Sequence, residues 1–128
     1  MAKVLRVFLA CALALATPIA LAQSAAVEIF NNTAVDLCVD VTSQRDCKQI
    51  RSRQAGQVSI RLEQWIRSGS EARRYNVPKT LFKPGLRLQA EADGRLYLIS
   101  QETPFPASPL PKQPSGFPLE PTRKVDLR

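Results

Sequence analysis

Residues 86–100 read LRLQAEADGRLYLIS, and apolar residues alternate with polar ones along the first half of this stretch. Alternation is typical of half-buried β-strands, because successive side chains point to opposite faces of a sheet. Asp93-Gly94 divides the two halves and is a preferred sequence for a two-residue type I′ turn. The predicted hairpin has a core face made of two cross-strand pairs, Ala90 with Tyr97 and Leu88 with Ile99. Leu96 and Leu98 fall on the opposite face, which we expect to be partly covered.

Apolar and polar residues also alternate over residues 35–41, and turn-forming residues follow at 42–44. We therefore predict a second hairpin that returns over residues 47–53. Its core-facing residues are Val35, Leu37, Val39 and Val41. Residues 63–72 contain a Ser68-Gly69-Ser70 breaker and are expected to form a loop or one short helical turn. Additional strands are expected at residues 27–29, 58–62 and 73–77, with turns at 31–33, Gly56 and Pro84-Gly85.

The N-terminal residues predict export. Lys3 and Arg6 supply positive charge, residues 7–16 form an uncharged apolar run, and Ala20-Leu21-Ala22 places small residues where a signal peptidase reads them. We therefore expect a cleavable signal peptide at residues 1–22 and a mature protein that is periplasmic or secreted, with no stable membrane span after cleavage. The alternative is a retained anchor helix, which the short apolar run disfavours.

The remaining chain predicts one small all-β domain followed by a tail. About six short strands separated by turn signals favour a small antiparallel β-sandwich or open barrel. Seven of the chain's 10 prolines lie between Thr103 and Pro121, and proline lacks the amide donor that a central strand needs. We therefore predict a disulfide-containing β-domain at residues 23–102 and an extended Pro-rich tail at residues 103–128.

The tail carries four large apolar residues among its prolines: Phe105, Leu110, Phe117 and Leu119. A simple spacer would not need them, so we expect the tail to dock either on its own domain or on a partner. Residues 106–109 and 111–114 match the P-x-x-P motif, which binds aromatic grooves of signalling modules. Such modules are not expected in a cell envelope, so we interpret both segments as an intramolecular brace or a spacer.

Signal cleavage leaves two cysteines, Cys38 and Cys47, and an even pair in an oxidising compartment indicates a disulfide. A hairpin centred on residues 42–43 places them directly opposite each other, and it places Asp40 opposite Arg45. A bridge that closes such a short loop stabilises the fold by roughly 2–3 kcal/mol. The cysteines do not form a C-x-x-C motif and no thiolate-stabilising arrangement is evident along the chain, which favours a structural bridge over a redox-active one.

The chain contains no histidine. Ser-His and Cys-His nucleophile activation is therefore excluded, and most zinc and copper sites are disfavoured. We expect no metal, no cofactor and no enzymatic activity. Asp36 and Asp40 share a strand face, but ~13 Å of extended strand separates them, too far to hold one ion or to flank one glycosidic bond. We interpret them as solvated charges, which leaves a hydrolase that uses carboxylates alone as the weakest alternative.

The formal net charge of the chain is +7, and residues 45–95 are its basic part. Summed positive charge favours polyanionic partners, here an acidic envelope component or protein. Nucleic acid is not expected, because export separates the chain from it. A candidate anionic-ligand patch combines guanidinium groups with aromatic surfaces: Arg73, Arg74, Tyr75, Trp65, Arg51 and Arg53. The alternative is that the aromatic residues pack in or beside the core and that the arginines cover exposed strand edges.

These features favour an exported, non-enzymatic binding or accessory protein of the cell envelope, with a basic surface for an acidic partner. The alternative function is a structural or assembly factor whose tail, residues 103–128, docks on another envelope subunit. Both hypotheses require a contact surface in the envelope, and neither depends on a particular oligomeric state.

Overall fold

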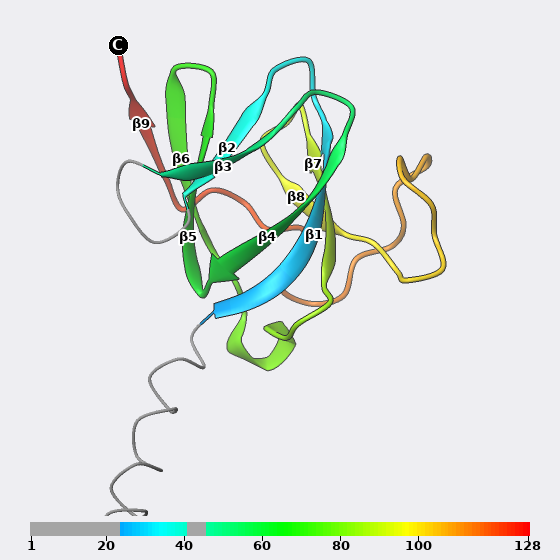
Figure 1. Cartoon of the computed structure of the whole chain (residues 1–128). Helices are drawn as coiled ribbons and strands as arrows, with labels where there is room; N and C mark the ends of the chain where they lie inside the picture. Colours follow the sequence, from blue (N-terminus) through cyan, green and yellow to red (C-terminus); the bar gives the residue numbers. More distant parts are fainter. Residues whose placement is uncertain (1–23, 41–45) are drawn as a thin grey trace, which may run out of the picture.

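The structure, a computed structural model, describes residues 24–40 and 46–128 and is almost entirely β (Figure 1). The strands are β1 (Ser24–Asn32), β2 (Leu37–Asp40), β3 (Cys47–Ile50), β4 (Ala55–Arg61), β5 (Glu63–Ser68), β6 (Glu71–Asn76), β7 (Arg87–Glu91), β8 (Leu96–Leu98) and β9 (Arg123–Asp126). They form a four-stranded sheet in the order β4-β1-β7-β8 and a five-stranded sheet in the order β3-β2-β5-β6-β9. The predicted all-β fold is confirmed as two sheets that do not close into a barrel.

One departure from a purely antiparallel arrangement is the parallel pairing of β1 with β7. The predicted turn at Pro84-Gly85 leads into β7, and Gly85 adopts a φ of 86° there. A single 3₁₀ turn, η2 (Lys79–Leu81), lies between β6 and β7. We found no helix within residues 24–40 and 46–128 whose length and apolar character would let it cross a membrane. The predicted signal peptide at residues 1–22 lies outside the described residues.

The core lies between the two sheets, and both contribute buried side chains. Val27, Ile29 and Leu88 come from the four-stranded sheet and are 0% exposed. Val39 and Ile66 come from the five-stranded sheet and belong to the same cluster. Strand alternation produces this arrangement, because every second residue of β1 is buried at its start. Burial of each such side chain contributes ~1.5–3 kcal/mol.

The β7–β8 hairpin forms, but its register differs from the predicted one by one residue. The observed pairs are Leu88 with Leu98, Gln89 with Tyr97 and Ala90 with Leu96. A slip of one residue exchanges the two faces of the return strand, because side chains alternate between faces. Leu96 therefore enters the core with 4% of its surface exposed, whereas Tyr97 faces outward.

The loop of this hairpin explains the slip. The Gly94 N–H donates to Glu91 O at 3.0 Å, and the Glu91 N–H donates to Arg95 O at 3.1 Å. Gly94 has a φ of 85°, whereas Asp93 does not enter the positive-φ region. A type I′ turn needs positive φ at both central residues, but a three-residue loop needs it only at the last one. The chain therefore forms the three-residue loop, and the predicted type I′ turn is wrong.

The β2–β3 hairpin is shifted by two residues from the predicted register. The observed pairs include Leu37 with Ile50, Cys38 with Gln49 and Asp40 with Cys47. The predicted direct opposition of Cys38 and Cys47 is therefore wrong, but the predicted disulfide is present along a diagonal, with the two Cα atoms 5.4 Å apart. A shift of two residues keeps each side chain on its own face, so Leu37 and Val39 stay in the core as predicted.

Two local predictions beside this hairpin are corrected. Val35 precedes β2 and is 45% exposed, so its predicted core position is wrong. Gly56 does not form a turn but lies inside β4, opposite Ile29. A Cβ atom at Gly56 would lie 3.0 Å from the Ile50 side chain, so the absence of a side chain lets the sheets approach. The predicted positions of Val41 and Arg45, and the turn at residues 42–44, lie outside the described residues.

Residues 63–72 form β5 and the start of β6, so the predicted loop or helical turn is wrong. The predicted breaker is the hairpin turn itself, in which Gly69 adopts a φ of 60°. Gln64 occupies a core position and is 2% exposed. Its amide donates to Asp40 O at 2.6 Å, and its Oε1 accepts from the Arg61 N–H at 3.0 Å, so its buried polar atoms are satisfied. A polar residue at a core position hides strand alternation from a hydrophobicity pattern.

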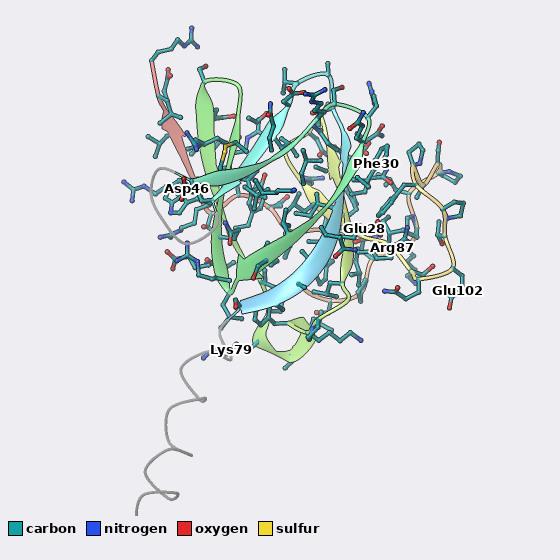
Figure 2. The ribbon with its side chains drawn as sticks, viewed as in Figure 1. Glu28, Phe30, Asp46, Lys79, Arg87 and Glu102 are labelled. Carbon is teal, nitrogen blue, oxygen red and sulfur yellow. A yellow bond between two sulfur atoms is a disulfide. The ribbon has the colours of Figure 1, made fainter. Side chains whose placement is uncertain are left out.

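The first part of the proline-rich segment covers the outer face of the four-stranded sheet. Phe105 stacks on Phe30 with ring centroids 5.2 Å apart, and the Arg87 guanidinium lies 4.0 Å from the Phe105 centroid. Arg87 also pairs with Glu28 at 3.0 Å and donates to Thr103 O at 2.6 Å. Figure 2 places Glu28, Phe30 and Arg87 on the side of the sheet from which this segment projects. Aromatic stacking and a cation–π contact therefore anchor the segment.

Hydrogen bonds between the Ala107 backbone and the Gln89 side chain also hold the proline-rich segment on the outer face of this sheet. The Ala107 N–H donates to Gln89 Oε1 at 2.8 Å, and Gln89 Nε2 donates to Ala107 O at 3.2 Å. The Gln89 side chain, which points away from the core, is consequently 0% exposed. Ile99 is likewise 2% exposed.

The second part of the segment closes one side of the core. The Gln113 side chain bonds to both backbone groups of Leu98, at 2.7 and 3.0 Å. Leu119 then pairs with Leu96 through two backbone hydrogen bonds of 2.8 and 3.0 Å. Phe117 and Leu119 are 7% and 4% exposed within the core cluster. The chain finally adds β9 to the edge of β6. Phe105, Phe117 and Leu119 of the proline-rich segment therefore pack on the protein's own sheets.

We predict that Phe117→Ala lowers the free energy of unfolding by about 3–4 kcal/mol, because it removes a buried ring and leaves a cavity. Leu127→Ala is the control: its side chain is 51% exposed, so the change should stay within about 0.5 kcal/mol. Urea unfolding followed by tryptophan fluorescence measures both. Equal effects of the two substitutions would contradict the core position of Phe117.

Candidate functional site

The outer face of the five-stranded sheet, here called the open face, carries the candidate site. Its side chains are those that alternate away from the core: Cys38, Asp40, Cys47, Gln49, Glu63, Trp65, Arg67, Ala72, Arg74, Asn76, Arg123 and Val125. Glu63 and Arg123 are exposed, and Trp65 is half-buried. The outer face of the other sheet differs, because the proline-rich segment covers Gln89 and Phe30 there. The two outer faces therefore have different exposure and different chemistry.

An aromatic ring and two guanidinium groups form a row across the open face. Trp65 pairs with Arg74 across β5 and β6, and Arg74 pairs with Arg123 across β6 and β9. Cross-strand neighbours on one face have Cβ atoms ~4.5–5.5 Å apart, so the three side chains adjoin. Arg74 lies 3.3 Å from Glu63, whose side chain is 60% exposed. Arg123 has no ion-pair partner in the part of the chain that the structure describes.

An open groove of about 630 Å³ begins at Arg67, which is two residues from Trp65 on the same face of β5. Val35 and Leu127 line it, and these are the exposed large apolar side chains of the described residues, at 45% and 51%. The disulfide and Arg67 form another part of its wall. Asp36 also lines the groove. The groove therefore combines apolar surface, a cystine and a cation.

Arg67 connects the groove to the disulfide. Its Nη2 donates to Cys38 Sγ at 3.1 Å and to Asp40 Oδ1 at 3.4 Å. Its Nε is buried and has no hydrogen-bond partner among the described residues. A buried unsatisfied donor costs ~1–3 kcal/mol. Among the described residues, the Arg67 cation is therefore compensated only by the Cys38 sulfur and by the 3.4 Å contact with Asp40.

The predicted anionic-ligand patch is divided between two faces of the sheet. Trp65 and Arg74 are neighbours on the open face, as described above. Arg73 and Tyr75 lie on the opposite face of β6: Arg73 pairs with Glu71 at 2.7 Å, and the Tyr75 hydroxyl donates to Gly94 O at 2.7 Å. Tyr75 is 3% exposed, so it is a core residue.

The other two predicted patch residues lie in the connection between β3 and β4. Arg51 and Arg53 are both exposed. Arg53 has a φ of 63°, and its guanidinium donates to Asn32 Oδ1 at the end of β1. The structure therefore brings together Trp65 and Arg74 but places Arg53 at the edge of the other sheet.

The sequence does not predict a functional role for three of the residues that line the groove: Val35, Arg67 and Leu127. The sequence predicts Val35 in the core and residues 63–72 as a loop or one short helical turn, so it predicts no sheet face for Arg67. Gln64 and Ile66 are buried and alternate with Trp65 and Arg67 along β5, but the polar Gln64 hides this alternation from a hydrophobicity pattern. Leu127 follows the last strand, and its position depends on the pairing of β9 with β6.

Burial and charge act on the inner residues of β6. Burial raises the pKa of Tyr75 above its ordinary value of ~10, and the Arg73 charge lowers it only in part. Burial acts to lower the pKa of Arg73, but its hydrogen bond to Glu71 is among the contacts that outweigh it, so that pKa is raised. Arg73 therefore stays a cation within a structural network rather than in a ligand site.

Asp36 and Asp40, the two carboxylates that the sequence pattern places on one strand face, do not converge. Asp36 accepts from Gln49 Nε2 at 3.0 Å and from the Ser52 N–H at 2.9 Å, whereas Asp40 pairs with Arg67 at 3.4 Å. Within residues 24–40 and 46–128, no three Cys, Asp or Glu side chains are grouped so that they could hold a metal ion.

We predict that Tyr75→Phe lowers the free energy of unfolding by about 1 kcal/mol at neutral pH, because Gly94 O loses its donor. The raised pKa of Tyr75 means that its contribution is present below pH ~10 and is lost as the pH rises further, since the unfolded state releases the proton first. The stability difference between wild type and variant should therefore narrow above pH ~10. Urea unfolding at pH 7 to 11 measures it, and Tyr97 titrates in both proteins. A constant difference would contradict the burial of the hydroxyl.

Comparisons of this chain with protein-family models, with curated proteins and with solved structures found no match.

Proposed function

We propose that this protein is an exported, non-enzymatic binding protein of the cell envelope that uses its open face to bind an acidic partner. The observation that carries the proposal is the row of Trp65, Arg74 and Arg123 beside a groove that contains Arg67. Tryptophan and arginine are the residue types most enriched among energetically dominant interface positions. Carboxylate groups are the planar acceptors that guanidinium groups bind in a bidentate manner.

The existing ion pairs leave this surface able to bind. Glu63 and Arg74 are both partly exposed and lie 3.3 Å apart, and exposed pairs of this kind contribute only ~0–1 kcal/mol. A partner carboxylate can therefore replace Glu63 at little cost. Arg123 needs no such exchange, because the described residues supply no carboxylate to it. Val35 and Leu127 add apolar surface that contact with a partner would remove from water.

The proposed absence of enzymatic activity is supported by composition and by geometry. The chain has no histidine, and Asp36 and Asp40 bind different groups. The proposed periplasmic or extracellular location is supported by the disulfide between Cys38 and Cys47, since such bonds persist in oxidising compartments.

The alternative function, in which residues 103–128 dock on another subunit, receives less support. Phe117 and Leu119 are 7% and 4% exposed in this protein's own core. Phe105 is stacked on Phe30. Because these three apolar side chains of the segment already pack within this protein, we assign the contact surface to the open face.

We predict that the purified protein binds poly-glutamate and that the interaction weakens at least tenfold between ~50 and ~500 mM salt, because screening acts strongly on exposed charges. The chain has one tryptophan, so fluorescence reports on Trp65. The double variant Arg74→Ala/Arg123→Ala should weaken binding about tenfold, as expected for two pairs of up to ~1 kcal/mol each.

The matched control removes the same charge elsewhere. Lys79 and Lys83 are exposed in the connection between β6 and β7, away from the strands of the open face. Lys79→Ala/Lys83→Ala should leave the affinity within about twofold of wild type. An equal loss in both double variants would indicate a response to net charge alone and would reject the open face as the binding surface.

A further inference from the structure

We infer that the Cys38–Cys47 disulfide is a thiol–disulfide exchange site in which Cys38 is the leaving thiolate and Arg67 stabilises it. This inference goes beyond the proposed binding function: both use the groove that contains Arg67, but exchange does not require that an acidic partner binds the open face. It rests on two observations: the Arg67 Nη2–Cys38 Sγ contact of 3.1 Å and the position of both cysteines in an open groove. The co-reactant is a free thiol of another molecule, either a protein cysteine or a small thiol.

The Arg67 contact distinguishes the two sulfur atoms. Arg67 donates to Sγ of Cys38, and Cys47 has no such donor among the described residues. A disulfide sulfur is a weak acceptor, whereas a thiolate is a full anion that accepts a charge-assisted hydrogen bond. Arg67 therefore stabilises the reduced state more than the oxidised state. A disulfide whose reduced form is stabilised is more easily reduced.

Other charges near the sulfur atoms act in the opposite direction but are partly engaged. Asp40 shares the strand face of Cys38, Asp36 directly precedes β2, and Asp46 precedes Cys47. Asp40 accepts from Arg67 at 3.4 Å, and Asp36 accepts from two other groups. From β5, the charged residue that contacts Cys38 is Arg67 itself. The facing residue of β3 is the uncharged Gln49.

The groove provides access to the disulfide. Both cysteines are half-buried and line the groove, which is open to solvent and has a volume of about 630 Å³. Val35 and Leu127 flank the approach and are exposed, so the apolar side chains of a cysteine-containing peptide would pack there. Thiol–disulfide exchange needs access to one sulfur atom, with the other able to leave. The geometry assigns attack to Cys47 and departure to Cys38.

The reaction is balanced as two exchanges. The first thiolate attacks Cys47 Sγ, a mixed disulfide forms, the Cys38–Cys47 bond breaks, and its electron pair moves to Cys38 Sγ beside Arg67. A second thiolate attacks the incoming sulfur of the mixed disulfide and releases Cys47. Two external thiols are thereby oxidised to one disulfide, and the protein disulfide is reduced to two thiol groups, which take up protons according to pH.

The fold is able to survive reduction, as reversible exchange requires. β2 is paired on both edges, with β3 and with β5. Leu37, Val39 and Ile50 are 3%, 0% and 2% exposed, so the core contacts of these strands do not depend on the bridge. The short loop that the bridge closes also limits how much stability is lost on reduction.

The inference is tested by equilibrating the purified protein with glutathione redox buffers and measuring the reduced fraction by mass spectrometry after thiol alkylation. Arg67→Met keeps an unbranched apolar stem but removes the charge. We expect the disulfide of Arg67→Met to be about tenfold harder to reduce, a difference of about 30 mV. Arg67→Lys should restore part of the effect, because a nearby ammonium also stabilises a thiolate. An unchanged equilibrium in Arg67→Met overturns the inference.

The matched control is Arg61→Met, at an exposed arginine in the other sheet. It should leave the redox equilibrium within about twofold of wild type, and a tenfold shift there would overturn the role of Arg67. A second measurement needs no variant. In the reduced wild-type protein, alkylation of Cys38 should reach half its maximal rate about one pH unit below that of Cys47. Equal profiles, or an inverted order, would reject Cys38 as the stabilised thiolate.

Discussion

The backbone pairing of Leu96 with Leu119 is the contact on which the path of residues 103–128 depends. Its two hydrogen bonds of 3.0 and 2.8 Å hold the chain at the edge of the four-stranded sheet. Before this point the segment lies on the outer face of that sheet, and after it the chain crosses to form β9. Phe117 and Leu119 fill the side of the core at the crossing. A segment with the composition of a linker is in this way part of the domain.

This path makes the two outer faces of the protein different. Arg87 is held by Glu28, by the Phe105 ring and by backbone carbonyl groups, so its charge serves to anchor the proline-rich segment. Arg67 and Arg74 lie on the other outer face with one long or exposed ion pair each. Arginine thus has a structural role on the face that the proline-rich segment covers. On the open face, which none of the described segments covers, arginine is available to bind other groups.

The sequence predicted the type of most elements, but its registers depended on details that hydrophobicity does not carry. Gly94 adopts the single positive-φ conformation that a three-residue loop needs. The resulting register places Leu96 in the core, where the predicted register placed Tyr97. Gln64 is buried because backbone groups satisfy its amide, which concealed β5 from the pattern. Of the predicted patch, Trp65 and Arg74 adjoin because they pair across β5 and β6, whereas Tyr75 lies on the other face of β6.

The sequence by itself determined the all-β class and the partnership of the two cysteines, because alternation and cysteine count are properties of the chain. It also excluded histidine chemistry. Only the tertiary structure decided that Arg67, 29 residues from Cys38, contacts its sulfur, and that Leu127 lies in the same groove as Val35. The physical reason is that contacts between distant strands follow from register and from the order of strands in each sheet, and local residue patterns specify neither.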